Sequence, residues 1–154
     1  MMRYDLKAPD LLRADVTLPA SKSISNRVSI LAALSAEAAP LRNLADSDDG
    51  RALQRALASA DETVDIGAAG TAMRFLTAYF AAQPGRTCLL TGTERMRRRP
   101  IGLLVDALRG LGADIAYAGD EGYPPLRIVG RRLCGGEVTM ESGVSSQYLS
   151  ALLM

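Results

Sequence analysis

The alternation of hydrophobic and polar positions predicts that strands and helices alternate along this chain. Apolar residues recur at the i, i+3, i+4 spacing of a one-sided helix over residues 52–60 and 103–111. The polar run 46–49 supplies a cap for the first of these helices, and Pro100 lies at the start of the second. Three further stretches, 28–35, 75–82 and 148–154, are apolar on nearly every side, which is typical of helices buried inside a fold. Strands are predicted at 16–19, 63–66, 86–91, 113–117, 126–129 and 137–140. This order indicates a fold of the α/β or α+β class.

Each of the three apolar helices follows a turn of small residues that is suited to an anion. In the first turn, residues 20–27, serines accompany Lys22 and Arg27. The turns at 67–74 and 141–147 repeat this plan with glycines and further hydroxyl residues. Because the free N–H groups at a helix N-terminus carry partial positive charge, a phosphate or carboxylate fits such a turn. The alternative is that Ser23 or Ser25 only caps its helix and that the cations are solvated. Three occurrences of one arrangement favour the anion site.

Length, charge and composition restrict the function further. The chain has 154 residues, of which 48% are hydrophobic, enough for one domain-sized core. A net charge of +1 and a pI near 7.8 argue against a nucleic-acid partner. No apolar run has the length of a membrane span and the start lacks a signal-peptide pattern, so we expect no membrane partner and a cytoplasmic protein. Without any histidine, Cys88 and Cys134 form neither a zinc site nor a Cys-His pair, and we expect both to be buried thiols in strands.

Cations are distributed unevenly in the sequence. There are only two lysines, Lys7 and Lys22, against sixteen arginines, and a lone lysine between serines suggests a compact point charge. Four of the arginines occupy positions 95, 97, 98 and 99, between the predicted strand 86–91 and Pro100. Such a cluster is usually a solvated face. Its place between a strand and a helix indicates an active-site loop for one of the four, and the residues alone do not select which.

Five segments taken together resemble successive signatures of the 5-enolpyruvylshikimate-3-phosphate synthase (3-phosphoshikimate 1-carboxyvinyltransferase) family. They are residues 18–27, 69–74, 94–102, 123–128 and 143–154, in family order across almost the whole chain. The resemblance implies transfer of the enolpyruvyl group of phosphoenolpyruvate to the 5-hydroxyl of shikimate 3-phosphate, with release of phosphate, on the route to chorismate and the aromatic amino acids. It implies these two small molecules as substrates, no cofactor, no metal and a monomeric full-length protein, and the family is the target of the herbicide glyphosate.

The resemblance also implies a fold of two lobes with the active site between them. Each lobe would be an inside-out α/β barrel, built from three βαβαββ units with helices packed inside. Residues 1–19 would form a strand segment associated with the other lobe, and residues 20–154 would supply about two of the three units of the first lobe. With the second lobe absent, the chain is expected to be an N-terminal fragment that is inactive alone.

Site residues follow from the resemblance position by position. Lys22 would touch both substrates, is the expected catalytic residue and could help proton transfer. The residues expected to hold shikimate 3-phosphate are Lys22, Ser23, Arg27, Ser145, Ser146 and Gln147. Those expected to hold phosphoenolpyruvate are Lys22, Gly70 and Arg95, which selects Arg95 from its cluster. Ala68 stands where the family commonly has Asn, so a backbone group or water would have to replace that amide.

Two alternatives stay open at this point. The sister family that transfers enolpyruvyl to UDP-N-acetylglucosamine shares the fold, but it typically has Lys-Asn where this chain has Lys22 and Ser23. It also carries a cysteine in a mobile loop, a setting expected for neither cysteine here. The second alternative, from a different class, is a non-catalytic anion-binding module or truncated remnant.

Overall fold

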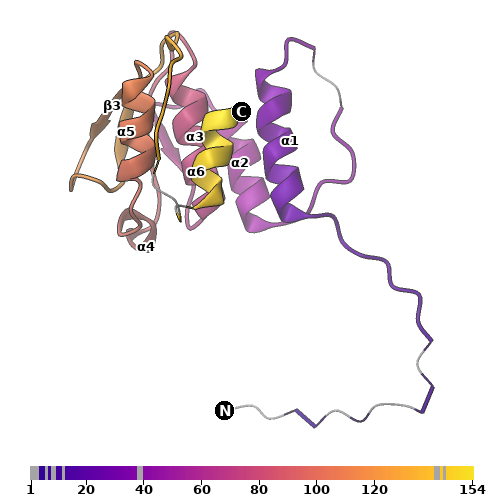
Figure 1. The fold of residues 1–154 in the computed structure, drawn as a ribbon. Helices are drawn as coiled ribbons and strands as arrows, with labels where there is room; N and C mark the ends of the chain where they lie inside the picture. Colours follow the sequence, from indigo (N-terminus) through magenta and orange to yellow (C-terminus); the bar gives the residue numbers. More distant parts are fainter. Residues whose placement is uncertain are drawn as a thin grey trace.

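A computed structural model describes residues 4, 5, 7, 10, 11, 13–37, 40–140, 143 and 145–154. The described part combines a small sheet with a group of helices, and its N-terminal segment extends away from them (Figure 1). The helices are α1 (Lys22–Leu34), α2 (Asp48–Ala58), α3 (Gly70–Ala81), α4 (Glu94–Arg97), α5 (Gly102–Gly110) and α6 (Ser146–Leu153). The strands are β1 (Thr63–Asp65), β2 (Thr87–Thr91), β3 (Asp114–Tyr117) and β4 (Leu126–Val129).

The four strands form one mixed sheet in the order β1-β2-β4-β3. β1 pairs in parallel with β2, and β4 pairs antiparallel with both β2 and β3. Apart from the short helix α4, the chain from β1 onward makes one βαβαββ run, in the order β1, α3, β2, α5, β3 and β4. The parallel step needs a crossover helix, which α3 provides, whereas the antiparallel strands β3 and β4 are joined by a loop. The structure thus contains the type of unit that the family resemblance implies.

Helix α3 lies at the centre of the fold. All of its residues except Tyr79 are buried, as its apolar sequence predicts. It packs against β2 and β4 on one side, and against α1, α2, α5 and α6 on its others. Residues that alternate along the strands complete this core, including Val64, Leu90 and Ile128.

The expectation that all three apolar helices are buried on every side is wrong for α1 and α6. Ile24 and Leu31 of α1 are 64% and 49% exposed, and Leu153 of α6 is 86% exposed. Both helices contact α3 from the outside of the helix group, so each buries only the face turned toward it. Apolar periodicity predicts which face of a helix favours burial. Whether another element packs on that face depends on the tertiary structure.

Two predicted strands are also absent from the structure. Residues 16–19 and 137–140 are described, and neither run is a strand. A strand needs a hydrogen-bonded neighbour, and neither run has one in this sheet. Of the two cysteines, Cys88 is buried in β2 as expected, and burial raises the pKa of its thiol. Cys134 is exposed and lies outside any strand, so its prediction is wrong.

Candidate functional site

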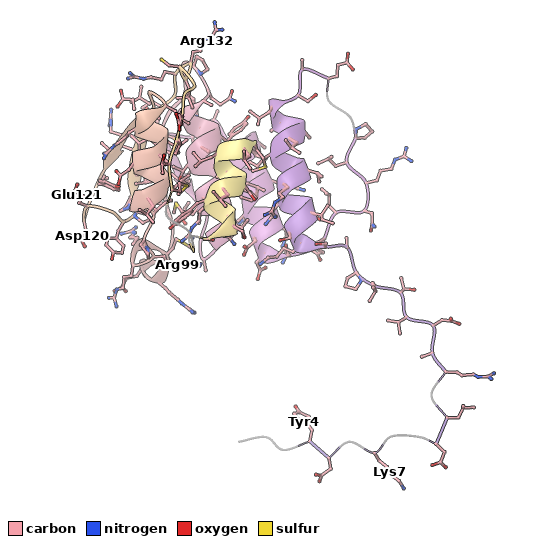
Figure 2. The ribbon with its side chains drawn as sticks, in the orientation of Figure 1. Tyr4, Lys7, Arg99, Asp120, Glu121 and Arg132 are labelled. Atoms are coloured by element: carbon pink, nitrogen blue, oxygen red, sulfur yellow. The ribbon has the colours of Figure 1, made fainter. Side chains whose placement is uncertain are left out.

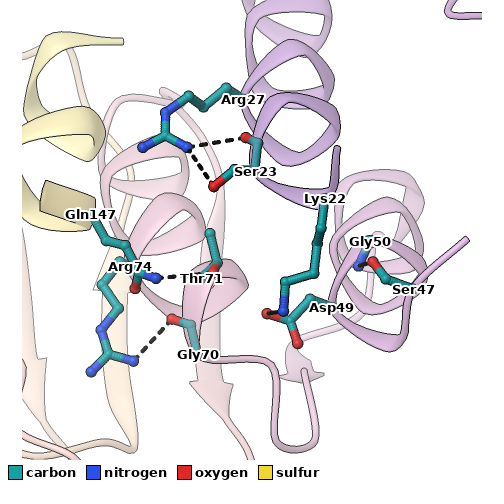
Figure 3. A network of polar contacts seen from close by, with 10 residues as sticks. All are labelled: Lys22, Ser23, Arg27, Ser47, Asp49, Gly50, Gly70, Thr71, Arg74 and Gln147. Carbon is teal, nitrogen blue, oxygen red and sulfur yellow. Dashed lines mark hydrogen bonds and ion pairs between the residues drawn. The ribbon is translucent and has the colours of Figure 1, made fainter. Parts of the chain in front are cut away.

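The N-terminal ends of α1, α2, α3 and α6 meet at one end of the helix group. An ion pair joins the first turns of α1 and α2, and a hydrogen bond from Gln147 to Thr71 joins the first turns of α6 and α3 (Figure 3). A surface pocket also lies between the start of α2 and the loop before α3, lined by residues that include Asp49 and Ala68. Because the dipoles of these helices point the same way, their positive ends add at this place. We call this the shared helix end.

Side-chain caps distinguish α3 from the other three helices of the shared helix end. Ser21, Ser47 and Ser145 cap α1, α2 and α6 by accepting hydrogen bonds from backbone N–H groups of the first turns. The cap of α1 is therefore Ser21, and the alternative that assigned this task to Ser23 or Ser25 is wrong. At the N-terminus of α3 stands Ala69, which has no side-chain cap. The first N–H groups of α3 thus receive no side-chain acceptor, which suits them to an anion.

Lys22 is the first residue of α1 and projects from the shared helix end toward α2. Its Nζ lies 3.2 Å from Oδ2 of Asp49, in the first turn of α2. Figure 3 draws this pair, and Asp49 lines one pocket with Ala69, the residue that precedes α3. Half of the Lys22 side chain is exposed, so its ammonium remains open to a ligand.

Arg27 lies one turn further along α1 and links it to α6. One terminal nitrogen donates to the backbone oxygen and the hydroxyl of Ser23 at 3.0 and 3.3 Å, and the other donates to the hydroxyl of Ser150 at 2.8 Å. Its guanidinium carbon also lies 5.5 Å from the ring centre of Phe75 on α3. These contacts hold the guanidinium between α1, α3 and α6 (Figure 3).

The start of α6 brings a second group of polar side chains to the shared helix end. Ser145 accepts a hydrogen bond from the N–H of Gln147 at 3.3 Å, and Gln147 donates through its side-chain amide to Thr71 at 3.2 Å. Ser145 and Ser146 are exposed. Residues 141, 142 and 144 of the predicted turn 141–147 lie outside the described residues.

Arg74 is a cation buried behind the start of α3. It is 5% exposed and donates to the backbone oxygens of Gly70 at 2.9 Å and Pro100 at 3.3 Å. Its guanidinium carbon lies 5.9 Å from the ring centre of Tyr148, whose hydroxyl donates to the same Pro100 oxygen. Burial, and then the neighbouring charge of Arg99, lower the pKa of Arg74.

The arginine cluster at 95–99 divides into two pairs. Arg98 forms an ion pair with Glu94, and Arg97 donates to the backbone oxygen of Gly92 at 3.2 Å. Arg95 and Arg99 instead line a cavity of about 430 Å³ together with Ala68 and Met96. Arg99 lies near α4 (Figure 2), and its guanidinium is so close to Gly70 that a Cβ at that position would collide with it.

The structure therefore brings the residues predicted from the sequence to one place. Arg95 lines the adjoining cavity. The other predicted residues lie at or next to the shared helix end, namely Lys22, Ser23, Arg27, Gly70, Ser145, Ser146 and Gln147. Three contributors escaped the sequence reasoning, namely Asp49, Ser150 and Arg74. Arg74 is the last residue of the predicted anion turn 67–74, and that position was the signal for it. Asp49 carried no such signal, because an acidic residue in a first turn is ordinary capping chemistry.

Two absences concern the described residues only. No group of three or more histidine, cysteine, aspartate or glutamate side chains gathers there in a way that would hold a metal ion. In the same part of the chain, no helix has the length and apolar character needed to cross a membrane.

Comparisons with known proteins agree on one family. The model of EPSP synthase (3-phosphoshikimate 1-carboxyvinyltransferase) matches residues 6–60 and 51–154. A 3-phosphoshikimate 1-carboxyvinyltransferase from Bacteroides fragilis strain YCH46 is 58% identical over 153 residues, which are 99% of this chain and 37% of the relative. One from Photobacterium damsela subsp. piscicida is 45% identical over 180 residues, 100% of this chain and 42% of the relative.

Among solved structures, EPSP synthase from Acinetobacter baumannii superposes with a TM-score of 0.78 at 25% identity, over 90% of this chain and 37% of that one. This match confirms the predicted fold class, an incomplete inside-out α/β barrel of the enolpyruvyl transferase type. The chain spans about two fifths of the length of the relatives it matches.

Proposed function

Because this chain belongs to the EPSP synthase (3-phosphoshikimate 1-carboxyvinyltransferase) family, we propose that it supplies part of the site in which the enolpyruvyl group of phosphoenolpyruvate is transferred to shikimate 3-phosphate. In this reaction the 5-hydroxyl oxygen loses its proton as it adds to C2 of phosphoenolpyruvate, and C3 gains a proton. The tetrahedral ketal then loses phosphate and a proton from C3. Both substrates are polyanions, and the charge moves between carboxylate and phosphate as the reaction proceeds.

The observation that carries the proposal is the shared helix end. Four helix N-termini lie at this end, with the Lys22 ammonium beside α2 and the Arg27 guanidinium between α1, α3 and α6. Such fixed dipoles and charges stabilise developing negative charge without reorganising. The uncapped start of α3 adds N–H groups that no side chain occupies. An anionic ligand is the partner that this electrostatic arrangement favours.

We assign the ligands by their position around this end. Shikimate 3-phosphate is bound between α1 and α6, by Ser23 and Arg27 from one helix and by Ser145, Ser146 and Gln147 from the other, and Lys22 reaches it from the first turn of α1. Phosphoenolpyruvate is bound at the start of α3, between Gly70, Lys22 and Arg95. In this arrangement Lys22 stands between the two substrates, which is the place for a group that contacts both and helps to transfer a proton.

The division into an N-terminal segment over residues 1–19 and a partial lobe over residues 20–154 is part of the proposal, as is the absence of activity in this chain alone. An enolpyruvyl transfer needs positioned cations and a general acid on both sides of a cleft that excludes water. Membership of a family that glyphosate targets, a cytoplasmic location and a monomeric full-length protein are further predictions from the family.

Calorimetric titration with shikimate 3-phosphate tests the proposal directly. The 154-residue chain is expected to bind shikimate 3-phosphate weakly, in competition with inorganic phosphate, and to show no heat with UDP-N-acetylglucosamine at the same concentration. A binding signal only with the UDP-sugar would assign the chain to the sister reaction. An absence of binding to either ligand, in a chain that melts cooperatively, would contradict the assignment of the shared helix end.

A further inference from the structure

Asp49 is the carboxylate that faces inward from the first turn of α2. Its side chain is 19% exposed, whereas that of its neighbour Asp48 is 96% exposed. The two residues also have different partners. Asp48 pairs with Arg51 on its own helix, while Asp49 reaches across to the Lys22 ammonium of α1 at 3.2 Å.

Electrostatics make this pair necessary for the placement of Lys22. A cation at the first residue of a helix is disfavoured by the positive end of the helix dipole. The dipole of α2 has the opposite effect on Asp49, because a carboxylate is stabilised at a helix N-terminus. Asp49 therefore holds its charge at little cost, and it offsets the repulsion that Lys22 meets at the start of α1.

A carboxylate at an anion-binding end also needs an explanation, since its charge repels the ligand. Lys22 has a flexible four-carbon stem, and its side chain is 52% exposed. Without a fixed partner its ammonium would sample many positions in solvent. With Asp49 in place, the ammonium is held against the first turn of α2, where Asp49 lines the same pocket as Ala69, the residue before α3 (Figure 3).

We propose that Asp49 is a positioning residue, which fixes the Lys22 ammonium where it meets both substrates. This role rests on the proposed function of Lys22, and it goes beyond helix capping, the task that the sequence suggests for the run 46–49. The Asp49 carboxylate repels the anionic ligand to some extent, but it also holds the ammonium at a fixed position relative to the reacting groups.

The two lysines of the chain make the contact measurable without any substrate. With lysine labelled by ¹⁵N, only Lys7 and Lys22 give side-chain ammonium signals, and the Lys7→Arg variant assigns them. Lys7 lies on the extended N-terminal segment, away from the helices (Figure 2), and serves as an internal reference. The measured quantity is the mobility of each ammonium, from relaxation and from its coupling to the side-chain carbons.

Asp48→Asn is the matched control for Asp49→Asn, because both remove one carboxylate from the same helical turn. We expect an ordered Lys22 ammonium in the unsubstituted chain and in Asp48→Asn. In Asp49→Asn its mobility should rise to that of Lys7, and Asp49→Glu should restore part of the order. Equal Lys22 mobility in Asp48→Asn and Asp49→Asn would overturn the inference. If Asp49→Asn does not fold, the same comparison is made with Asp49→Glu, which keeps the charge and displaces it.

Ligand titration separates this inference from the proposed function. Shikimate 3-phosphate is added while the Lys22 signal is followed. A signal ordered by Asp49 that does not respond to the ligand would refute the role of Lys22, and the positioning role with it. A signal that responds equally in Asp48→Asn and Asp49→Asn would refute only the role of Asp49.

Kinetics of the full-length protein give the last test. We expect Asp49→Asn to lower kcat roughly 10- to 100-fold, the order of loss that a misplaced reacting group causes. KM should change much less, because loss of the carboxylate also removes repulsion of the anionic substrates. Asp48→Asn should stay within about two-fold of the unsubstituted protein in kcat. A change of kcat and KM by the same factor in both variants would show that Asp49 acts only through its charge.

Discussion

Replacement of Gly70 by alanine tests whether the start of α3 receives an anion. Gly70 is the first residue of this buried helix, and its own N–H lies at the uncapped end. A methyl group there would collide with the Arg99 guanidinium and would lie 3.2 Å from a terminal nitrogen of Arg74. The substitution therefore fills the space in which a ligand would meet the helix end.

The expected effect on stability is small, because two contributions oppose each other. Alanine in place of glycine favours a helix by about 0.5–1 kcal/mol in its interior, and by less at its first residue. Arg99 is exposed and can swing away from the methyl group, whereas Arg74 is buried and held by two backbone oxygens, so it resists displacement. We expect the free energy of unfolding of Gly70→Ala to stay within about 1 kcal/mol of the unsubstituted value.

The expected effect on binding is much larger. The methyl group blocks one hydrogen bond between an anionic ligand and the helix end and displaces Arg99 from its place. Loss of one hydrogen bond to a charged group costs about 1.5–3 kcal/mol, which corresponds to a dissociation constant about 10- to 150-fold higher. Calorimetry of the full-length protein with phosphoenolpyruvate, in the presence of saturating shikimate 3-phosphate, measures this change.

Gly110→Ala provides the matched control. Gly110 is the last residue of α5, and a Cβ there meets no heavy atom within 4 Å. It should raise the free energy of unfolding by about 0.5–1 kcal/mol and leave phosphoenolpyruvate binding unchanged. If Gly70→Ala binds phosphoenolpyruvate as tightly as Gly110→Ala does, the ligand does not approach α3, and the placement of phosphoenolpyruvate is refuted.

Three further predictions concern the other parts of the site. Arg27→Ala should raise the dissociation constant of shikimate 3-phosphate about 10- to 150-fold, and Ser145→Ala should also raise it. Because Ser145 caps α6, a melting curve must first show that Ser145→Ala stays folded. Unchanged calorimetric affinity in both variants would contradict their assignment. Arg95→Ala should lower turnover far more than Arg98→Ala, since Arg98 is engaged with Glu94. Equal losses would mean that the cluster acts as a diffuse basic patch. The 154-residue chain alone should release no phosphate from the two substrates above a no-enzyme control, and measurable release would show that the other part of the family's length is dispensable.

Local signals were sufficient for the elements of the βαβαββ run. The switch between a period of two and a period near 3.6 predicted β1, β2, β3 and β4 to within one residue at either end. It failed for 16–19 and 137–140, where the strand pattern is present without a pairing partner in the described sheet. A strand forms only when a second segment pairs with it, and the pattern of one segment does not show whether that partner exists.

The site residues also differ in whether neighbouring sequence or a distant element identifies them. Lys22, Arg27 and Gly70 lie in turns whose residue types point to an anion, so the sequence indicates them. The partners that fix them come from other elements, namely Asp49 for Lys22 and Ser150 for Arg27. Neither partner has a distinctive local pattern, because a serine in an apolar helix and an aspartate in a first turn are both common.

The charges at the shared helix end differ in how firmly they are held, and this difference suits a reaction in which charge moves. Arg74 is fixed by burial, and no carboxylate forms an ion pair with it among the described residues. It acts as a permanent cation behind the uncapped start of α3. Lys22 is more accessible but is held in place by Asp49, whereas Arg27 is held by oxygens of Ser23 and Ser150 with which an anionic ligand can compete. Under the proposed function, a site with two fixed cations and one adjustable cation suits a carboxylate and a phosphate bound together, because the adjustable one can follow the charge as it passes between them.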